Sequence, residues 1–132
     1  VVPVPDEHLL SEDRALILHG EEQLERRMEE LRSLIRQHAQ AKKDRVHLEQ
    51  FRKVKKATLM REAEAHGYKT AALQEREAYA DPAYAQLIEA LAEATGQEAE
   101  TWWSLQLEQW KFDAWRTQMA SERAEKVRYG VG

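Results

Sequence analysis

The most informative pattern of hydrophobic and polar positions lies between Trp102 and Met119, a stretch that contains all four tryptophans of the chain. With about 100° of rotation per residue on a helix, its apolar positions fall into two stripes. One stripe is Trp103, Leu107, Trp110 and Ala114, and the other is Leu105, Phe112, Trp115 and Met119. Because a helix with one apolar stripe rests on one neighbour, two stripes predict two neighbours.

A different pattern comes earlier in the chain. After Glu21, apolar residues recur at alternating intervals of four and three, which is the spacing of a coiled-coil seam; they are Leu24, Met28, Leu31 and Ile35. His38 continues this spacing and is interpreted as a tolerated interface residue or a determinant of register. No glycine or proline falls between Gly20 and Gly67, so we expect a long helix over about residues 21–66. Periodicity alone leaves open whether it is one helix or two.

Local signals place the other boundaries of the N-terminal half. The prolines of the opening VVPVP favour extended backbone, so residues 1–10 are expected to form an extended N-terminal arm. Ser11 is a good N-cap, which predicts a helix starting near residue 12. Gly20 is expected to interrupt that helix, because glycine costs about 1 kcal/mol relative to alanine in a helix interior.

The C-terminal half carries clearer signals. Gly67 is suited to the left-handed position after a helix, and Thr70 can cap a short helix that follows. Asp81 and Pro82 combine an N-cap acid with proline at the first helical position. We therefore expect a bend over residues 67–81 and a return helix over about residues 82–128. Residues 95–98, TGQE, could form a capping box that restarts this helix.

Together these elements predict an all-α protein. We expect one helical domain over residues 11–132, an elongated antiparallel helical hairpin with coiled-coil-like packing. The stripe that contains Trp115 is expected to close this hairpin against residues 48–59. The stripe that contains Trp103 and Trp110 would then face either the seam at residues 24–35 or another copy of the chain. The predicted interface residues are Leu24, Met28, Leu31, Ile35, Trp103, Leu107 and Trp110.

Composition agrees with long helices and limits the partners. The chain has 132 residues, of which 33% are charged, with five glycines, three prolines and no cysteine. Limited apolar surface for a monomeric core favours a homodimer or higher oligomer. The absence of cysteine excludes disulfides and cysteine-ligated zinc and is compatible with a cytoplasmic location. No apolar run approaches the roughly 18 residues that a membrane-spanning helix needs, so we expect no membrane association.

Charge is distributed unevenly along the chain. Residues 42–61 carry eight basic residues against two acids, whereas residues 71–125 carry eleven acids against four basic residues. Five of the basic residues fall within roughly 100° of arc on a helix; they are Lys42, Arg45, Arg52, Lys53 and Lys56. This basic stripe could bind the phosphates of single- or double-stranded DNA or an acidic protein. It could equally be a solvated face, or one neutralised by the acidic return helix.

No pattern indicates catalysis. The five histidines lack HExxH or paired ExxH spacing, and the nucleotide-binding and nucleophile motifs GxGxxG, GxxxxGK[ST] and GxSxG are absent. The sequence therefore predicts a non-enzymatic protein with no metal, no cofactor and no small-molecule substrate. The tryptophans are expected to lie in a core or an interface rather than to stack on bases.

Three segments carry a resemblance to known proteins: KKATLMREAEAHG (55–67), REAYADPAYAQLIEAL (76–91) and DAWRTQMASERAEKV (113–127). Together they resemble small helical proteins of unassigned activity encoded in the early and recombination regions of tailed bacteriophages. The resemblance implies a role in phage DNA metabolism in the host cytoplasm. It supplies no active residues and does not extend to residues 1–40.

Two functional hypotheses follow. The first is an accessory protein of phage DNA recombination or processing that binds nucleic acid, or a host or phage DNA-processing protein, through the basic stripe or the acidic half. The second is a structural oligomer, such as a virion-assembly or scaffold component, in which the two-striped helix is buried between subunits.

Overall fold

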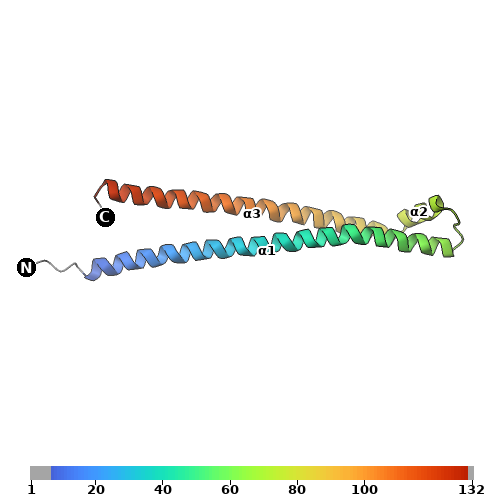
Figure 1. Cartoon of the computed structure of the whole chain (residues 1–132), viewed down its shortest axis with the longest axis horizontal. Helices are drawn as coiled ribbons and strands as arrows, with labels where there is room; N and C mark the ends of the chain where they lie inside the picture. The colour runs from blue at the N-terminus through green and yellow to red at the C-terminus, as the bar shows by residue number, and fades with distance from the viewer. Residues whose placement is uncertain (1–6, 131–132) are drawn as a thin grey trace, which may run out of the picture. The chain divides into compact units, whose positions relative to one another are not determined.

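The computed structural model describes residues 7–130, which form three α-helices and no strand. Helix α1 spans Glu7–Ala65, α2 spans Ala71–Ala80 and α3 spans Pro82–Arg128 (Figure 1). The described chain is therefore all-α, as the sequence predicts. The coiled-coil-like packing stays a prediction.

Two compact units make up the chain, whereas the sequence led us to expect one helical domain. Among the described residues, unit 1 contains those up to Leu34 and those from Gln106 onward, and unit 2 contains Ile35–Leu105. Helices α1 and α3 each contribute residues to both units. Each unit has its own contacts and is described by itself.

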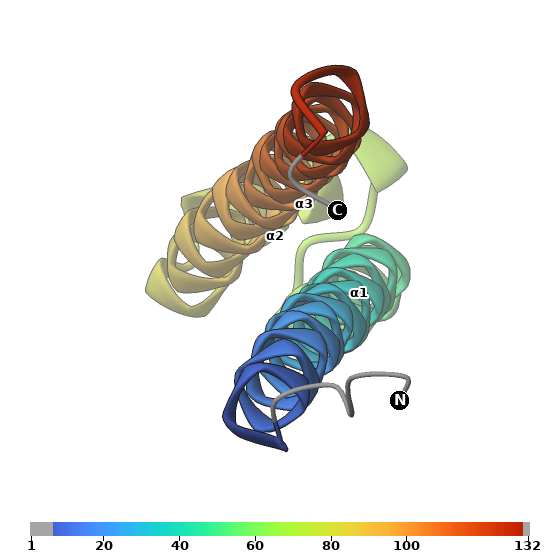
Figure 2. The same ribbon diagram turned by 90° about the vertical axis from the view of Figure 1, so that its left-hand side faces the viewer.

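Unit 1 is a pair of helical segments. Its parts of α1 and α3 lie side by side and run in opposite directions (Figure 1, Figure 2). Trp115 joins them: its Nε1 donates to Oε1 of Gln23 at 3.3 Å, and the Arg27 guanidinium lies 5.2 Å from the centre of its ring. None of the residues of unit 1 whose burial is described is fully buried. The unit therefore has no closed core of its own within the described residues.

Unit 2 contains all the fully buried side chains of the described chain. Here α2 and the first part of α3 pack against the C-terminal part of α1. The buried residues are Ala41, Leu59, Ala63, Ala78, Leu87 and Thr101. Most of them are small, so the helices approach closely but remove little apolar area from water.

The end of α1 is fixed by a glycine, as the sequence predicts. Gly67 has φ of 101°, a conformation that L-residues rarely adopt. The Gly67 N–H donates to the Glu64 carbonyl at 3.1 Å, and the Tyr68 N–H donates to the Ala63 carbonyl at 3.1 Å. These two bonds are those of a Schellman motif, which satisfies carbonyls that the helix end would otherwise leave unpaired.

The next two boundaries also follow local signals. Thr70 caps α2, because its Oγ1 accepts from the Leu73 N–H at 3.2 Å. Asp81 serves both helices that flank it: its N–H donates to the Ala78 carbonyl at 3.3 Å, and its Oδ1 accepts from the Ala83 N–H at 2.8 Å. Pro82 is the first residue of α3. The predicted bend and the predicted starts of α2 and α3 are confirmed.

The N-terminal boundary of the long helix differs from the prediction. Helix α1 begins at Glu7, so residues 7–10 are helical and not part of an extended arm; residues 1–6 lie outside the described residues. Ser11 therefore lies inside α1, and Gly20 does not interrupt it. Continuing through Gly20 costs about 1 kcal/mol, whereas a break leaves several backbone groups unpaired. The helix expected over residues 21–66 is a single piece.

Helix α3 also continues where a restart was considered. Residues 95–98 lie in its interior. The Thr95 hydroxyl donates to the Leu91 carbonyl at 2.8 Å and therefore does not cap a new helix. No capping box is needed, because the backbone hydrogen bonds of α3 are not broken there.

The partner of the Trp115 stripe was wrongly predicted. Trp115 contacts Gln23 and Arg27 in unit 1, whereas residues 48–59 belong to unit 2. In unit 2 the side chain of Lys56 in that segment meets Glu75 of α2. The short helix α2 thus occupies part of the position where the sequence pattern placed the tryptophan stripe.

The glycines offer a test of these boundaries. A Cβ built on Gly20 or Gly96 meets nothing within 4 Å, and both residues lie inside helices. We expect Gly20→Ala and Gly96→Ala each to increase stability by up to about 1 kcal/mol. Gly67→Ala should instead lower it by about 1–2 kcal/mol, because of the positive φ. Thermal denaturation followed by circular dichroism measures all three. Destabilisation by Gly96→Ala would contradict a continuous α3.

Candidate interaction surfaces

Arg45 of the predicted basic stripe is held inside unit 2. Its guanidinium donates from Nε to Glu98 of α3, and from a terminal nitrogen to the other Glu98 oxygen at 3.4 Å. It also pairs with Glu49, one turn along α1, at 2.9 Å. The bonds to Glu98 and Glu49 raise the pKa of Arg45, and Arg45 lowers the pKa of Glu98. Only 23% of the Arg45 side chain is exposed, so it is poorly placed to meet a phosphate.

Lys56 is held in a similar way by α2. Its Nζ lies 3.2 Å from Oε1 of Glu75 and 4.9 Å from the centre of the Tyr79 ring. Interactions with Tyr79 and Glu75 raise the pKa of Lys56, and Lys56 lowers the pKa of Glu75. An acidic partner therefore neutralises two of the five stripe positions: Glu98 of the return helix pairs with Arg45, as predicted, and Glu75 of α2 pairs with Lys56, which was not predicted.

The other three stripe residues are Lys42, Arg52 and Lys53, and all three are exposed. Lys42 lines an open groove of about 660 Å³ in unit 2 with Arg45, Glu98 and Trp103. Two carboxylates, Glu49 and Glu98, also line this groove. An anion bound there would meet negative as well as positive groups.

A buried polar contact lies beside this groove. Thr101 is 4% exposed, and its hydroxyl lies 2.9 Å from the Gln97 carbonyl and 3.0 Å from the Glu98 carbonyl. His38 Nδ1 lies 3.1 Å from the same hydroxyl. The Thr101 hydroxyl and His38 Nδ1 therefore share a hydrogen bond between α1 and α3. The contact places His38 between the two helices of unit 2, and its role as a determinant of register stays a prediction. Thr101 carries no signal in the sequence that would have identified it.

The paired tryptophans remain largely accessible. Trp102 and Trp103 stack edge to face, with ring centres 4.7 Å apart. Trp103 is 59% exposed. In unit 1, Trp110 is 58% exposed and Leu107 is also exposed. All three predicted interface residues of α3 therefore present apolar surface to solvent.

The predicted interface residues of α1 divide into two groups. Met28 and Leu31 are half-buried, whereas Leu24 and Ile35 are exposed. The seam is thus only partly covered within the chain.

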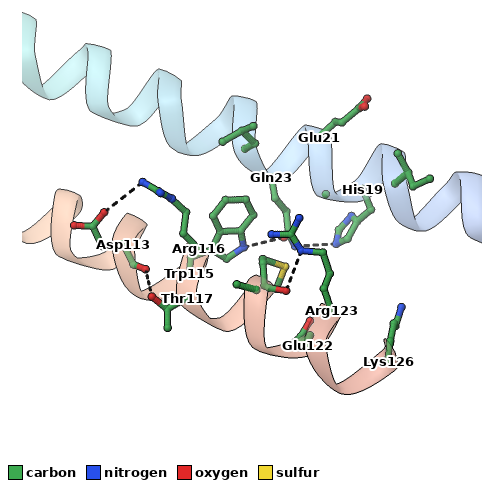
Figure 3. Close-up of a pocket in the computed structure, with 15 residues that line it drawn as sticks. His19, Glu21, Gln23, Asp113, Trp115, Arg116, Thr117, Glu122, Arg123 and Lys126 are labelled. Atoms are coloured by element: carbon green, nitrogen blue, oxygen red, sulfur yellow. Dashed lines mark hydrogen bonds and ion pairs between the residues drawn. The ribbon is translucent and has the colours of Figure 1, made fainter. Parts of the chain in front are cut away.

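A groove of about 990 Å³ runs between the two helical segments of unit 1 (Figure 3). Gln23 and Trp115 point toward one another across it, and Gln23 Nε2 donates to His19 Nε2 at 2.9 Å. The Gln23 amide is therefore oriented, with its oxygen toward Trp115 and its nitrogen toward His19. The lining also contains charged residues from both helices and the apolar or small residues Ile17, Gly20, Leu24, Met119 and Ala120.

Neither a metal site nor a membrane span is found in the described part of the chain. No group of three or more histidine or acidic side chains there could hold a metal ion. Among residues 7–130, no helix combines the length and apolar character needed to cross a bilayer.

Comparison with models of protein families, with curated proteins and with solved structures found no match for this chain.

The Arg45–Glu98 contact predicts a specific response to acid. Because the pKa values of Glu98 and Glu75 are lowered on folding, their stabilising contribution is present above the ordinary pKa of glutamate. It is lost as the pH falls through the lowered values. We expect the melting temperature to fall between about pH 5 and about pH 3. Glu98→Gln should melt lower near neutral pH and lose less on acidification.

The matched control is Glu100→Gln, which removes one exposed carboxylate from the same helix. It should follow the wild-type pH profile. A Glu98→Gln profile parallel to that of the wild type would show that this ion pair contributes nothing measurable.

Proposed function

We propose that this chain is a non-enzymatic helical protein that works by self-assembly, as a structural or scaffold component. The observation that carries the proposal is the location of the buried residues: all of them in the described chain belong to unit 2. Ordering a residue costs about 1–2 kcal/mol of backbone entropy, which burial of apolar surface must offset. The paired helices of unit 1 gain little of this within one chain, so further burial against another chain is favoured.

The exposed tryptophans support the same proposal. Trp103 and Trp110 are each more than half exposed. A buried aromatic side chain contributes more than most other residues to an interface, and tryptophan is enriched where binding energy concentrates. A second protein surface is therefore a better environment for these rings than water.

The phage context comes from the resemblance of three segments, described above, to small helical phage proteins. On that resemblance we propose that the assembly acts in the host cytoplasm, in phage DNA metabolism. The non-enzymatic character rests on the absence of catalytic motifs in the sequence.

A second candidate function is binding to nucleic acid, alone or with a DNA-processing protein. It is supported by the exposure of Lys42, Arg52 and Lys53. Against it stand the net charge of −4 and the engagement of Arg45 and Lys56 with Glu98 and Glu75. Self-assembly is the better supported of the two.

Light scattering across a range of protein concentrations tests self-assembly. We expect a mass of at least twice the 15.4 kDa of one chain, increasing with concentration. Trp110→Ala should reduce the average mass, because truncating a central tryptophan costs about 2 kcal/mol or more, roughly a 30-fold rise in Kd. Gln109→Ala, an exposed neighbour on α3, is the control. A mass of one chain at every concentration would refute self-assembly.

Fluorescence anisotropy with labelled single- and double-stranded oligonucleotides tests the second candidate. If it holds, reversing the three exposed stripe residues together (Lys42→Glu, Arg52→Glu, Lys53→Glu) should abolish binding at low salt. Each lost phosphate contact should reduce the salt slope by about 0.9 on a duplex. A charge-matched control reverses Lys43, Arg61 and Lys69, which are exposed residues outside the stripe. Equal loss in both variants would indicate a nonspecific charge effect.

A further inference from the structure

We propose that the groove of unit 1 is covered by unit 1 of a second copy, with α1 of each copy lying against α3 of the other. The inference rests on the proposed self-assembly and names the surface and the arrangement that would produce a dimer. Three observations support it: exposed apolar residues line the groove, its two walls carry opposite net charge, and small residues keep it open.

The apolar residues that line the groove are incompletely covered. Ile17 is 61% exposed and Leu24 is 41% exposed, although both line it. Trp115 and Met119, from α3, are half-buried. Two helices with this exposed seam form half of a four-helix bundle, in which a second pair supplies the missing layer.

The two helical segments differ in charge. Residues 17–30 of α1 carry five acids against two arginines; the acids are Glu21, Glu22, Glu25, Glu29 and Glu30. Residues 109–128 of α3 carry five basic residues against three acids; the basic residues are Lys111, Arg116, Arg123, Lys126 and Arg128. One pair of helices thus has an acidic side and a basic side.

The charge difference between the two segments favours a second copy of this chain as the partner and determines how that copy is oriented. A dimer with a two-fold axis parallel to the helices places α1 of one copy over α3 of the other, so each acidic segment meets a basic one. An axis perpendicular to the helices would instead bring α1 against α1, which places like charges together. The surface is therefore self-complementary in one arrangement and repulsive in the other.

Small residues allow close approach at the same place. Gly20 of α1 and Ala120 of α3 both line the groove. A Cβ added to Gly20 would meet nothing within 4 Å, so the space above it is open. A helix of the second copy can approach here without displacing a side chain.

Charge reversal in two complementary variants tests this arrangement. The first variant is Glu21→Arg with Glu25→Arg, and the second is Arg116→Glu with Arg123→Glu. In a dimer of either variant both contacts become repulsive, so each alone should dimerise at least about 30-fold more weakly than wild type. In an equimolar mixture both contacts become attractive again, so a one-to-one heterodimer should form. Sedimentation velocity measures the masses, and circular dichroism verifies that each variant is helical.

Ala120→Arg keeps the proposal testable if a charge variant fails to fold. Ala120 is exposed within one chain, so the substitution should leave the helices intact and block the second copy. Gln118→Arg, also exposed on α3 but outside the groove lining and outside both apolar stripes, is its control and should keep the wild-type dimer.

The outcomes separate this inference from the proposed function. If the wild type and Ala120→Arg assemble equally, the groove is not the dimer surface, although self-assembly stands. If the variant with Glu21→Arg and Glu25→Arg dimerises more tightly than the wild type, α1 lies against α1 and the proposed arrangement is wrong. If the wild type is a single chain at all concentrations, both proposals fail.

Discussion

The contact between Arg45 of α1 and Glu98 of α3 is compatible with only one register of the two helices in unit 2. One guanidinium binds both oxygens of Glu98 and also reaches Glu49. The His38–Thr101 hydrogen bond lies nearby and requires the same register. The few buried side chains of this unit are mostly small and would tolerate a shift along the helix. The polar contacts therefore contribute specificity where the apolar ones contribute little.

Local chemistry made part of the fold predictable. Gly67, Thr70, Asp81 and Pro82 act on their own backbone neighbours, so residue type and order were sufficient to place the bend. The same kind of signal failed at Ser11 and at residues 95–98. A good capping residue permits a helix to start but does not require it, and α1 and α3 continue through both places.

The pairing of side chains across helices could not be obtained in that way. The sequence correctly predicts basic residues on the surface of α1, since Lys42, Arg52 and Lys53 of the basic stripe are exposed. That Arg45 meets Glu98 and Lys56 meets Glu75 depends on where the chain reverses and on the space that α2 occupies. For the same reason Trp115 faces Gln23 rather than the leucines of residues 48–59. Many acidic residues and leucines fit the spacing of charged and apolar positions equally well. Only the register of the paired helices determines which of them become contact partners.

Asp81 has a consequence for the motions of unit 2. One residue ends α2 with its N–H and begins α3 with its carboxylate. There is thus no linker between these two helices that could absorb a change of direction. Fraying at the end of α2 would withdraw the cap of α3, and fraying at the start of α3 would release the end of α2. The two helix ends are expected to open as one cooperative event, which would appear in hydrogen exchange as a shared opening rate on both sides of residue 81.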